Sequence, residues 1–408
     1  FHWFESRVNP YPDGPPPQPP KGFFPFIWAA TKGLRHLILA MTLLTATIGA
    51  FEALLFSMLG SVVDWLAKVP PNQLWATQRQ HLLLLAGILL ASPLLIWLQA
   101  LCKYQGMAGN FPMRLRWNFH RHLLGQTMSF YQDEFAGRVS AKVMQTALAV
   151  RDTVLTLTDI MVFVLIYFVT MTAVVGNFDL SLMAPFLGWL VLYGCTLWFF
   201  VPRLGKASKA QADARSLMTG RITDAYTNIS TVKLFSQGQR EAGFTKAAMQ
   251  EFMQTVYRQM RLVSGFEVVN HTLSMLLIAS TAGVTLWLWV QGAVGVGAVA
   301  AATAMALRLN GISHWVMWEM SNLFEQIGTV QDGISTLARP IAITDASDAK
   351  PLQVSHGEIR FEDVSFAYGG QRPVIEHLSL TIRPGEKIGL VGRSGAGKST
   401  LVNLLLRF

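Results

Sequence analysis

The residues best suited to chemistry lie together near the end of the printed sequence. They follow the pattern GxxxxGK[ST] at every fixed position, with one further threonine: Gly392, Arg393, Ser394, Gly395, Ala396, Gly397, Lys398, Ser399 and Thr400. Glycines allow the backbone to curl around phosphates with its N–H groups pointing inward. Lys398 supplies a positive charge for the β- and γ-phosphates, and the Ser399 hydroxyl is a ligand for Mg²⁺. The run therefore predicts a site for a nucleotide and its magnesium ion.

This motif needs a strand before it and a helix after it. Residues 387–391 read KIGLV, which is typical of a strand, and residues 399–408 have the composition of a helix. The N-terminus of that helix adds a favourable partial charge for an anion. The alternative is a glycine-rich turn without function, which this context disfavours. Because residues 357–386 also alternate like strands, we expect 357–408 to be the N-terminal fragment of an α/β nucleotide-binding domain.

The rest of the chain has the composition of a membrane protein. Of the 408 residues, 51% are hydrophobic and 14% charged, whereas soluble proteins carry roughly 25% charged residues. A helix of about 20 apolar residues spans a bilayer, and six runs qualify: about 37–63, 81–102, 154–176, 181–202, 267–290 and 296–323. One such run could be a buried soluble helix, but six exclude that interpretation. We predict an all-α transmembrane domain over 34–335, preceded by a proline-rich segment (1–33) and followed by a linker (336–356).

The basic residues indicate which side of the membrane each loop faces. The loop at 103–153 holds seven Lys and Arg residues and the loop at 203–266 holds ten, whereas the three alternate loops contain only Lys68 and Arg79. The positive-inside rule then places both termini, both long loops and the nucleotide-binding domain in the cytoplasm. This asymmetry accounts for most of the net charge of +9 without a nucleic-acid partner. The long loops are rich in helix formers, so we expect the spans to continue as cytoplasmic helices.

A few polar residues lie within the apolar runs. Arg308 in the sixth run is costly at that depth, and Glu52 in the first run is a candidate partner for it. Trp315 and Glu319 share the helical face of Arg308, together with Ile312. Two interpretations stay open, a neutralising pair between helices and a cationic, aromatic surface along a substrate pathway. Two cysteines, Cys102 and Cys195, are expected to be buried bystanders.

With these features in place, the sequence resembles an ABC transporter of the exporter type. The resemblance covers nearly the whole chain and is sharpest in IRFEDVSFAYGGQRPVIEHLSLTIRPGEKIGLVGRSGAGKSTLVNLLLRF. It implies a half-transporter, with one six-span membrane domain followed by one nucleotide-binding domain. By this match Tyr368 stacks on the adenine of ATP. The stretch SFYQDEFAGRV followed by SAKVMQTALAVRD resembles the family's first intracellular loop, and DAYTNISTVKLFSQGQRE resembles the second. This resemblance implies docking helices near 145–151 and 224–231.

The resemblance also implies what the family needs for catalysis. The family's signature motif, Walker B aspartate, catalytic glutamate and switch histidine would follow residue 408, so the chain contains no catalytic residue of hydrolysis. We expect it to be truncated just after the Walker A motif, and the implied ATPase and translocase activity belongs to the complete protein. ATP and Mg²⁺ are the implied ligands.

The implied partners are a second half-transporter subunit, in a homo- or heterodimer, and the lipid bilayer. ATP-driven export of an amphipathic substrate, such as a lipid, a drug or a peptide-like molecule, is the favoured function. The alternatives are an importer, for example of a metal–siderophore complex, and a protein that does not pump: an ATP-gated channel, a regulator or a membrane-tethered P-loop enzyme. The expected location is a cell membrane, the inner (plasma) membrane of a bacterium.

Overall fold

The computed structural model describes residues 1–134, 136–235, 238–345, 348–350, 353–354, 356–368 and 373–407. These residues divide into two compact units. The helical unit contains residues 1–119 and 142–338, and the C-terminal unit contains residues 120–141 and 339–408. We describe each unit by itself.

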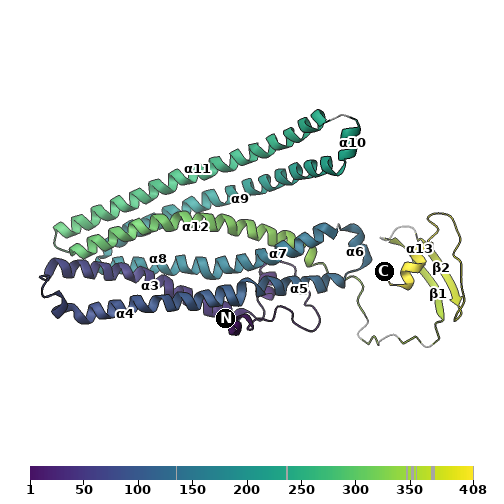
Figure 1. The fold of residues 1–408 in the computed structure, drawn as a ribbon, viewed down its shortest axis with the longest axis horizontal. Coiled ribbons are helices and arrows are strands. Elements are labelled where there is room, and N and C mark those ends of the chain that lie inside the picture. Colours follow the sequence, from purple (N-terminus) through teal and green to yellow (C-terminus); the bar gives the residue numbers. More distant parts are fainter. Residues whose placement is uncertain are drawn as a thin grey trace. The chain divides into compact units, whose positions relative to one another are not determined.

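Long helices make up the helical unit (Figure 1). They are α3 (Arg35–Lys68), α4 (Leu74–Ala100), α7 (Ala136–Leu155), α8 (Met161–Phe178), α9 (Met183–Thr227), α11 (Gly238–Val290) and α12 (Val296–Leu337). A π-helical segment, η1 (Leu101–Ala108), leads from α4 towards α5 (Asn110–Leu124), and a second, η2 (Thr156–Ile160), joins α7 to α8. Six continuous helical stretches in the described residues are long and apolar enough to cross a membrane. The predicted six-helix, multi-pass membrane domain is therefore confirmed.

Several helices extend well beyond the apolar runs. The fifth candidate span, α11, has 53 residues, whereas about 20 cross the hydrocarbon core. Figure 1 shows α9 and α11 running side by side and joined by the short helix α10 (Ile229–Leu234). The prediction that the spans continue as helices into the two long loops thus agrees with the observed helix bounds.

The helices α3 and α12 touch where both have glycine. A Cβ atom on Gly60 would lie 2.9 Å from the carbonyl oxygen of Gly297, and a Cβ atom on Gly297 would overlap the carbonyl oxygen of Gly60. Small residues allow such close approach between helices in a membrane. The Asp64 carboxylate accepts a hydrogen bond of 2.8 Å from the Gly297 backbone N–H and so satisfies the first turn of α12.

A buried polar cluster joins three helical segments at the two π-helical segments. Asp159 in η2 accepts hydrogen bonds from Gln99 (2.9 Å) and from Thr45 in α3. Its second carboxylate oxygen lies 2.7 Å from Nζ of Lys103 in η1, and its side chain is 6% exposed. A carboxylate at this burial is stable only if it is paired and hydrogen-bonded. Sequence reasoning did not single out this aspartate, although it lies within the third predicted span.

The N-terminal segment forms a strap along α5. The Asn110 amide donates to the carbonyl oxygen of Glu5 (2.8 Å), and Trp117 Nε1 donates to that of Pro12 (3.4 Å). Val8 is buried, and Tyr11 meets the Trp117 ring edge-on. Downstream, the short helix α2 (Phe23–Ala30) precedes the first span. The proline-rich residues therefore pack as a surface strap.

The C-terminal unit contains a two-stranded sheet and helix α13 (Lys398–Leu405), together with the short helix α6 (Met128–Asp133) and the first residues of α7. Strand β1 (Ile359–Phe366) pairs antiparallel with β2 (Ile375–Ile382), with Ile359 opposite Ile382. This agrees with the predicted start of an α/β domain. The strand predicted at 387–391 is not formed, because no third strand pairs with it among the described residues. Its Val391 side chain is 96% exposed.

The short helices of the two predicted intracellular loops have different bounds from those expected for the docking helices. Residues 145–151 lie inside the long helix α7, so that prediction is wrong. The short helix of this loop is α6 (Met128–Asp133), held by the Tyr131 hydroxyl, which donates to the carbonyl oxygen of Leu123 (2.8 Å). Burial raises the pKa of the Tyr131 hydroxyl above its ordinary value. In the second loop the short helix is α10, which begins at Ile229 and overlaps the end of the expected range 224–231, whereas residues 224–227 belong to α9.

Two smaller expectations need correction. Cys102 is buried, as expected, but Cys195 is exposed on the surface of α9 because it faces away from the helix bundle. Ile312 is buried, whereas Arg308 and Trp315 on the same predicted face are exposed. The face shared by these residues is wide, so positions along it differ in burial: Ile312 lies on the side that packs against neighbouring helices.

Candidate functional site

The predicted phosphate-binding loop has the backbone of an anion site. Gly395 and Gly397 both have φ of 83°, in the left-handed region that glycine adopts without strain. Gly397 is the N-cap of α13, so the free N–H groups of the first helical turn face the loop. A Cβ on Gly392 would lie 3.3 Å from the Cβ of Ala396, so a larger residue here would require the loop to shift by a few tenths of an ångström. The loop thus joins a curled backbone to a helix N-terminus, which suits a chain of phosphates.

The side chain of Lys398 spans the mouth of this loop. Its Nζ donates to the carbonyl oxygens of Gly392 and Arg393, at 2.8 Å each. These contacts hold a positive charge beside the curled backbone, where phosphate oxygens would replace the carbonyls as partners. Ser399 follows on the first turn of α13 and is exposed, so its hydroxyl oxygen is accessible as a ligand for a metal ion. The residues present therefore fit ATP with Mg²⁺.

Tyr368 and Thr400 come together beside the loop, although 32 positions separate them. Their hydroxyl groups form a hydrogen bond of 3.2 Å, and the Phe366 ring contacts the tyrosine edge-on. Thr400 is buried, whereas Tyr368 keeps 52% of its surface exposed. A flat ring is thus held next to the loop with an open face, which is the arrangement that stacking on a base requires.

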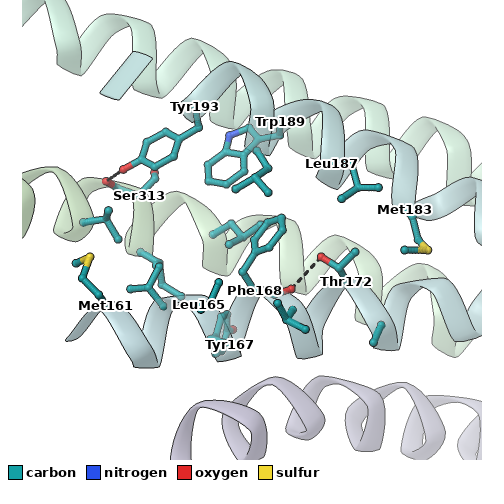
Figure 2. Close-up of a pocket in the computed structure, with 17 residues that line it drawn as sticks. Met161, Leu165, Tyr167, Phe168, Thr172, Met183, Leu187, Trp189, Tyr193 and Ser313 are labelled. Carbon is teal, nitrogen blue, oxygen red and sulfur yellow. Dashed lines mark hydrogen bonds between the residues drawn. The ribbon is translucent and has the colours of Figure 1, made fainter. Parts of the chain in front are cut away.

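A different kind of site lies in the helical unit. A cavity of about 570 Å³ opens between α8, α9 and α12. Figure 2 shows Met161, Leu165 and Phe168 of α8 facing Leu187, Trp189 and Tyr193 of α9 across it. The Tyr193 hydroxyl donates to the carbonyl oxygen of Ser313 on α12 (2.6 Å), so its polar end is already satisfied. A cavity lined in this way suits hydrocarbon or aromatic groups.

The aromatic side of this cavity is built from stacked rings. Trp189 and Tyr193 are four residues apart on α9, with ring centroids 4.8 Å apart and planes within 6°. Phe168 stacks on Trp189 from α8, at 6.4 Å. Sequence reasoning did not single out these residues. The spacing of Trp189 and Tyr193 was the available signal, because side chains at positions i and i+4 share a helical face.

The four polar residues proposed for a substrate pathway form two neighbouring pairs. Arg308 lies 3.3 Å from Glu52, and the two side chains are 49% and 33% exposed. They line a groove of about 500 Å³ between α3, α4 and α12. About two turns after Arg308 along α12, Trp315 Nε1 donates to Glu319 (3.1 Å). Although Arg308 and Glu52 are paired, both side chains remain accessible from the groove. This arrangement agrees with both interpretations, a neutralising pair between helices and a surface along a substrate pathway.

Comparisons with known proteins agree with this architecture. A family model described as "ABC transporter transmembrane region" matches residues 38–312, and one described as "ABC transporter" matches residues 375–408. An uncharacterized ABC transporter ATP-binding protein of Haemophilus influenzae is 55% identical over all of this chain, which covers 66% of that protein. An ATP-dependent lipid A-core flippase of Methylobacillus flagellatus is 31% identical over 77% of this chain and 54% of its own length.

A solved structure has the same fold. The structure of a bacterial Atm1-family ABC exporter with ATP bound matches 92% of this chain and 66% of its own, with a TM-score of 0.71 and 19% identity. The chain thus spans between about half and two thirds of the length of these relatives.

Proposed function

The chain belongs to the ABC transporter family, and from this premise we propose that the complete protein exports an amphipathic, lipid-like substrate in an ATP-driven cycle. The observation that carries the proposal is the cavity of about 570 Å³ within the membrane-spanning helices. Apolar lining at this depth would accept an acyl chain or a fused ring system and would reject sugars and free ions. The flippase among the relatives supports a lipid-like substrate.

The polar end of the substrate would contact the neighbouring groove. Arg308 and Glu52 attract each other there, but both remain partly exposed. The guanidinium has several N–H donors and can hold a carboxylate and a second anion together. We therefore propose that Arg308 receives an anionic or polar headgroup, while Trp315 and Glu319 line the path along α12.

In the C-terminal unit, this chain's residues would hold ATP and magnesium. The backbone N–H groups of Gly392–Gly397 and the first turn of α13 would bind the phosphates, and the Lys398 ammonium would neutralise the β- and γ-oxygens. Ser399 would be the chain's ligand for the metal, and Tyr368 would stack on the base. Hydrolysis of ATP supplies the free energy of the cycle when the nucleotide is bound. Its water-activating group is not among the residues that we assign.

A second half-transporter subunit is the proposed partner. The end of the α9–α11 pair exposes large apolar side chains on and around α10, including Tyr226, Leu234 and Phe235. An exposed apolar patch of this kind indicates an interface with another chain. Dimerisation would cover it, and the two chains could be identical or different.

The proposed location is the inner membrane of a bacterium. The basic loops support a cytoplasmic position for both long loops, both termini and the nucleotide site. The exposed membrane-facing helices support the bilayer as the environment of the helical unit.

Transport into inverted membrane vesicles tests the proposed direction. Vesicles containing the full-length protein should accumulate a fluorescent lipid-like amphiphile in their lumen or luminal leaflet when ATP is added outside. A variant with Lys398→Ala serves as the control for ATP dependence. ATP-driven loss of the probe from preloaded vesicles would instead identify an importer, and movement that needs no ATP would identify a channel or scramblase.

A further inference from the structure

A second, smaller cavity lies under the N-terminal strap. Its volume is about 250 Å³, and it is enclosed by the proline-rich strap, α2 and α5. The lining includes Pro19, Phe26, Lys32, Arg114, Leu115 and Phe119. Phe26 and Phe119 stack with their centroids 5.8 Å apart and form an apolar floor. Neither the phosphate-binding loop nor the substrate cavity uses any of these residues.

The walls of this cavity are fixed by contacts outside it. Arg114 donates from its guanidinium to the carbonyl oxygen of Asn9 (3.3 Å), and Trp117 Nε1 reaches that of Pro12 (3.4 Å). These bonds tie residues 9–12 to α5, so the prolines that follow are held across the cavity. A stiff proline segment loses little conformational entropy when it is held in this way. The cavity is therefore built into the fold of the helical unit.

Its charges have one sign. Lys32 and Arg114 line the cavity, and no carboxylate is among the lining residues. Within the described part of the chain, the Lys32 ammonium has neither a hydrogen bond nor an ion pair and is exposed. A Cβ on Gly33 would lie 3.1 Å from an Arg114 guanidinium nitrogen, so this cation sits against the residue next to Lys32. Two neighbouring cations above an apolar floor favour a ligand with an anionic head and an apolar body.

The neighbouring helix places this cavity at the membrane surface. Helix α2 ends at Ala30, and the first span begins with α3 at Arg35. Phe24 and Trp28 on α2 are 81% and 64% exposed, and the Arg35 guanidinium lies 3.7 Å from the centre of the Trp28 ring. Exposed aromatic side chains next to basic ones are typical of a helix lying in the headgroup layer.

We propose that this cavity binds the phosphate headgroup of an anionic membrane phospholipid. Lys32 and Arg114 would hold the phosphate, and the stacked Phe26 and Phe119 would contact the glycerol and the first methylenes. The volume of about 250 Å³ admits a headgroup but not two acyl chains, which would leave along α2 into the bilayer. The site goes beyond the proposed export function and rests only on insertion of the six spans.

Lipid retention tests this proposal without any reference to transport. Full-length protein in a neutral detergent is titrated with dioleoyl phosphatidylglycerol or dioleoyl phosphatidylcholine, and bound lipid is counted by native mass spectrometry while unfolding is followed by Tm. We expect phosphatidylglycerol to be retained and to raise Tm more than phosphatidylcholine does. Removal of one cation should weaken retention about fivefold.

Lys32→Gln is the main test variant, because the Lys32 ammonium is exposed and has no hydrogen bond or ion pair among the described residues. Lys21→Gln, an exposed lysine outside the cavity, is the matched control and should keep wild-type retention. Arg114→Gln should lose more than Lys32→Gln, because it also releases the strap. Equal retention of the two lipids, equal loss in the Lys21 and Lys32 variants, or the same rise in Tm with inorganic phosphate alone would each overturn the lipid assignment.

Discussion

The phosphate-binding loop and the membrane cavity bind by opposite means. The loop is built from backbone: left-handed Gly395 and Gly397 turn the chain, and the lysine completes it from the same short segment. The cavity is built from side chains on α8, α9 and α12, which come from three distant parts of the sequence. A backbone site is recorded in consecutive residues, whereas a side-chain cavity exists only after the helices pack. This difference explains why one was predicted residue by residue and the other was not.

Removing the charge of Lys398 should abolish the function of the phosphate-binding loop without changing the substrate cavity. We expect Lys398→Ala to lower ATPase activity of the full-length protein by about 10²-fold or more, because the Lys398 ammonium is the charge that lies against the curled backbone where the phosphates would bind. The steady-state ATPase rate in nanodiscs measures this, with Tm as the test of folding. The matched control is Lys387→Ala, which removes an exposed lysine upstream of the loop. Equal rates in the two variants would contradict the assignment.

Removing a buried charge should destabilise the helical unit without touching the loop. Asp159→Leu leaves the Lys103 ammonium without the carboxylate that lies 2.7 Å away. Loss of one member of a buried pair costs roughly 3 kcal/mol or more, so we expect a large fall in Tm in detergent.

The double variant Lys103→Met/Asp159→Leu separates the charge from the packing. It should recover most of the lost stability, because neither charge is then left uncompensated. If the double variant is no more stable than Asp159→Leu alone, the cluster acts through its shape or through the Thr45 and Gln99 bonds, and the charge argument fails.

A third prediction concerns Tyr368, which belongs to the proposed nucleotide site but lies outside the GxxxxGK[ST] motif. Tyr368→Ala should weaken ATP binding about tenfold, in line with the roughly 1–3 kcal/mol that stacking on a base contributes. Tyr368→Phe should bind ATP almost as tightly as the wild type, because stacking needs only the ring. Titration with a fluorescent ATP analogue distinguishes them. If the phenylalanine variant is as weak as the alanine variant, the hydrogen bond to Thr400 is what matters.

The smallest effect is expected at the exposed pair in the groove. Arg308→Gln should change the free energy of unfolding by less than about 1 kcal/mol, because pairs of this exposure contribute little. It should, however, reduce the preference for anionic over neutral amphiphiles about threefold, measured as stimulation of the ATPase. A marked loss of stability that Glu52→Gln restores would show that the pair is structural and does not select the substrate.

Much of the fold was predictable because long periodic patterns decide it. Six apolar runs gave six spans, and the GxxxxGK[ST] pattern located the loop. The strand at 387–391 was predicted from its residue types, but a strand forms only where a partner strand pairs with it. Similarly, the first docking helix was placed inside α7, because residue types do not fix where a helix turns back. Asp159 and the stacked Trp189 and Tyr193 depend on contacts between helices, and no short segment of sequence records such contacts.

The central claim is that substrate moves through the cavity between α8, α9 and α12 under the control of ATP. ATP-dependent movement of a fluorescent phospholipid across reconstituted vesicles tests it directly, with Leu165→Trp filling the cavity. Leu192→Trp is the matched control, since Leu192 is an exposed leucine on α9 that does not line the cavity. The account predicts that Leu165→Trp lowers lipid movement about tenfold while the Leu192 variant moves lipid like the wild type. Equal movement in the two variants, with equal ATPase rates, would contradict it.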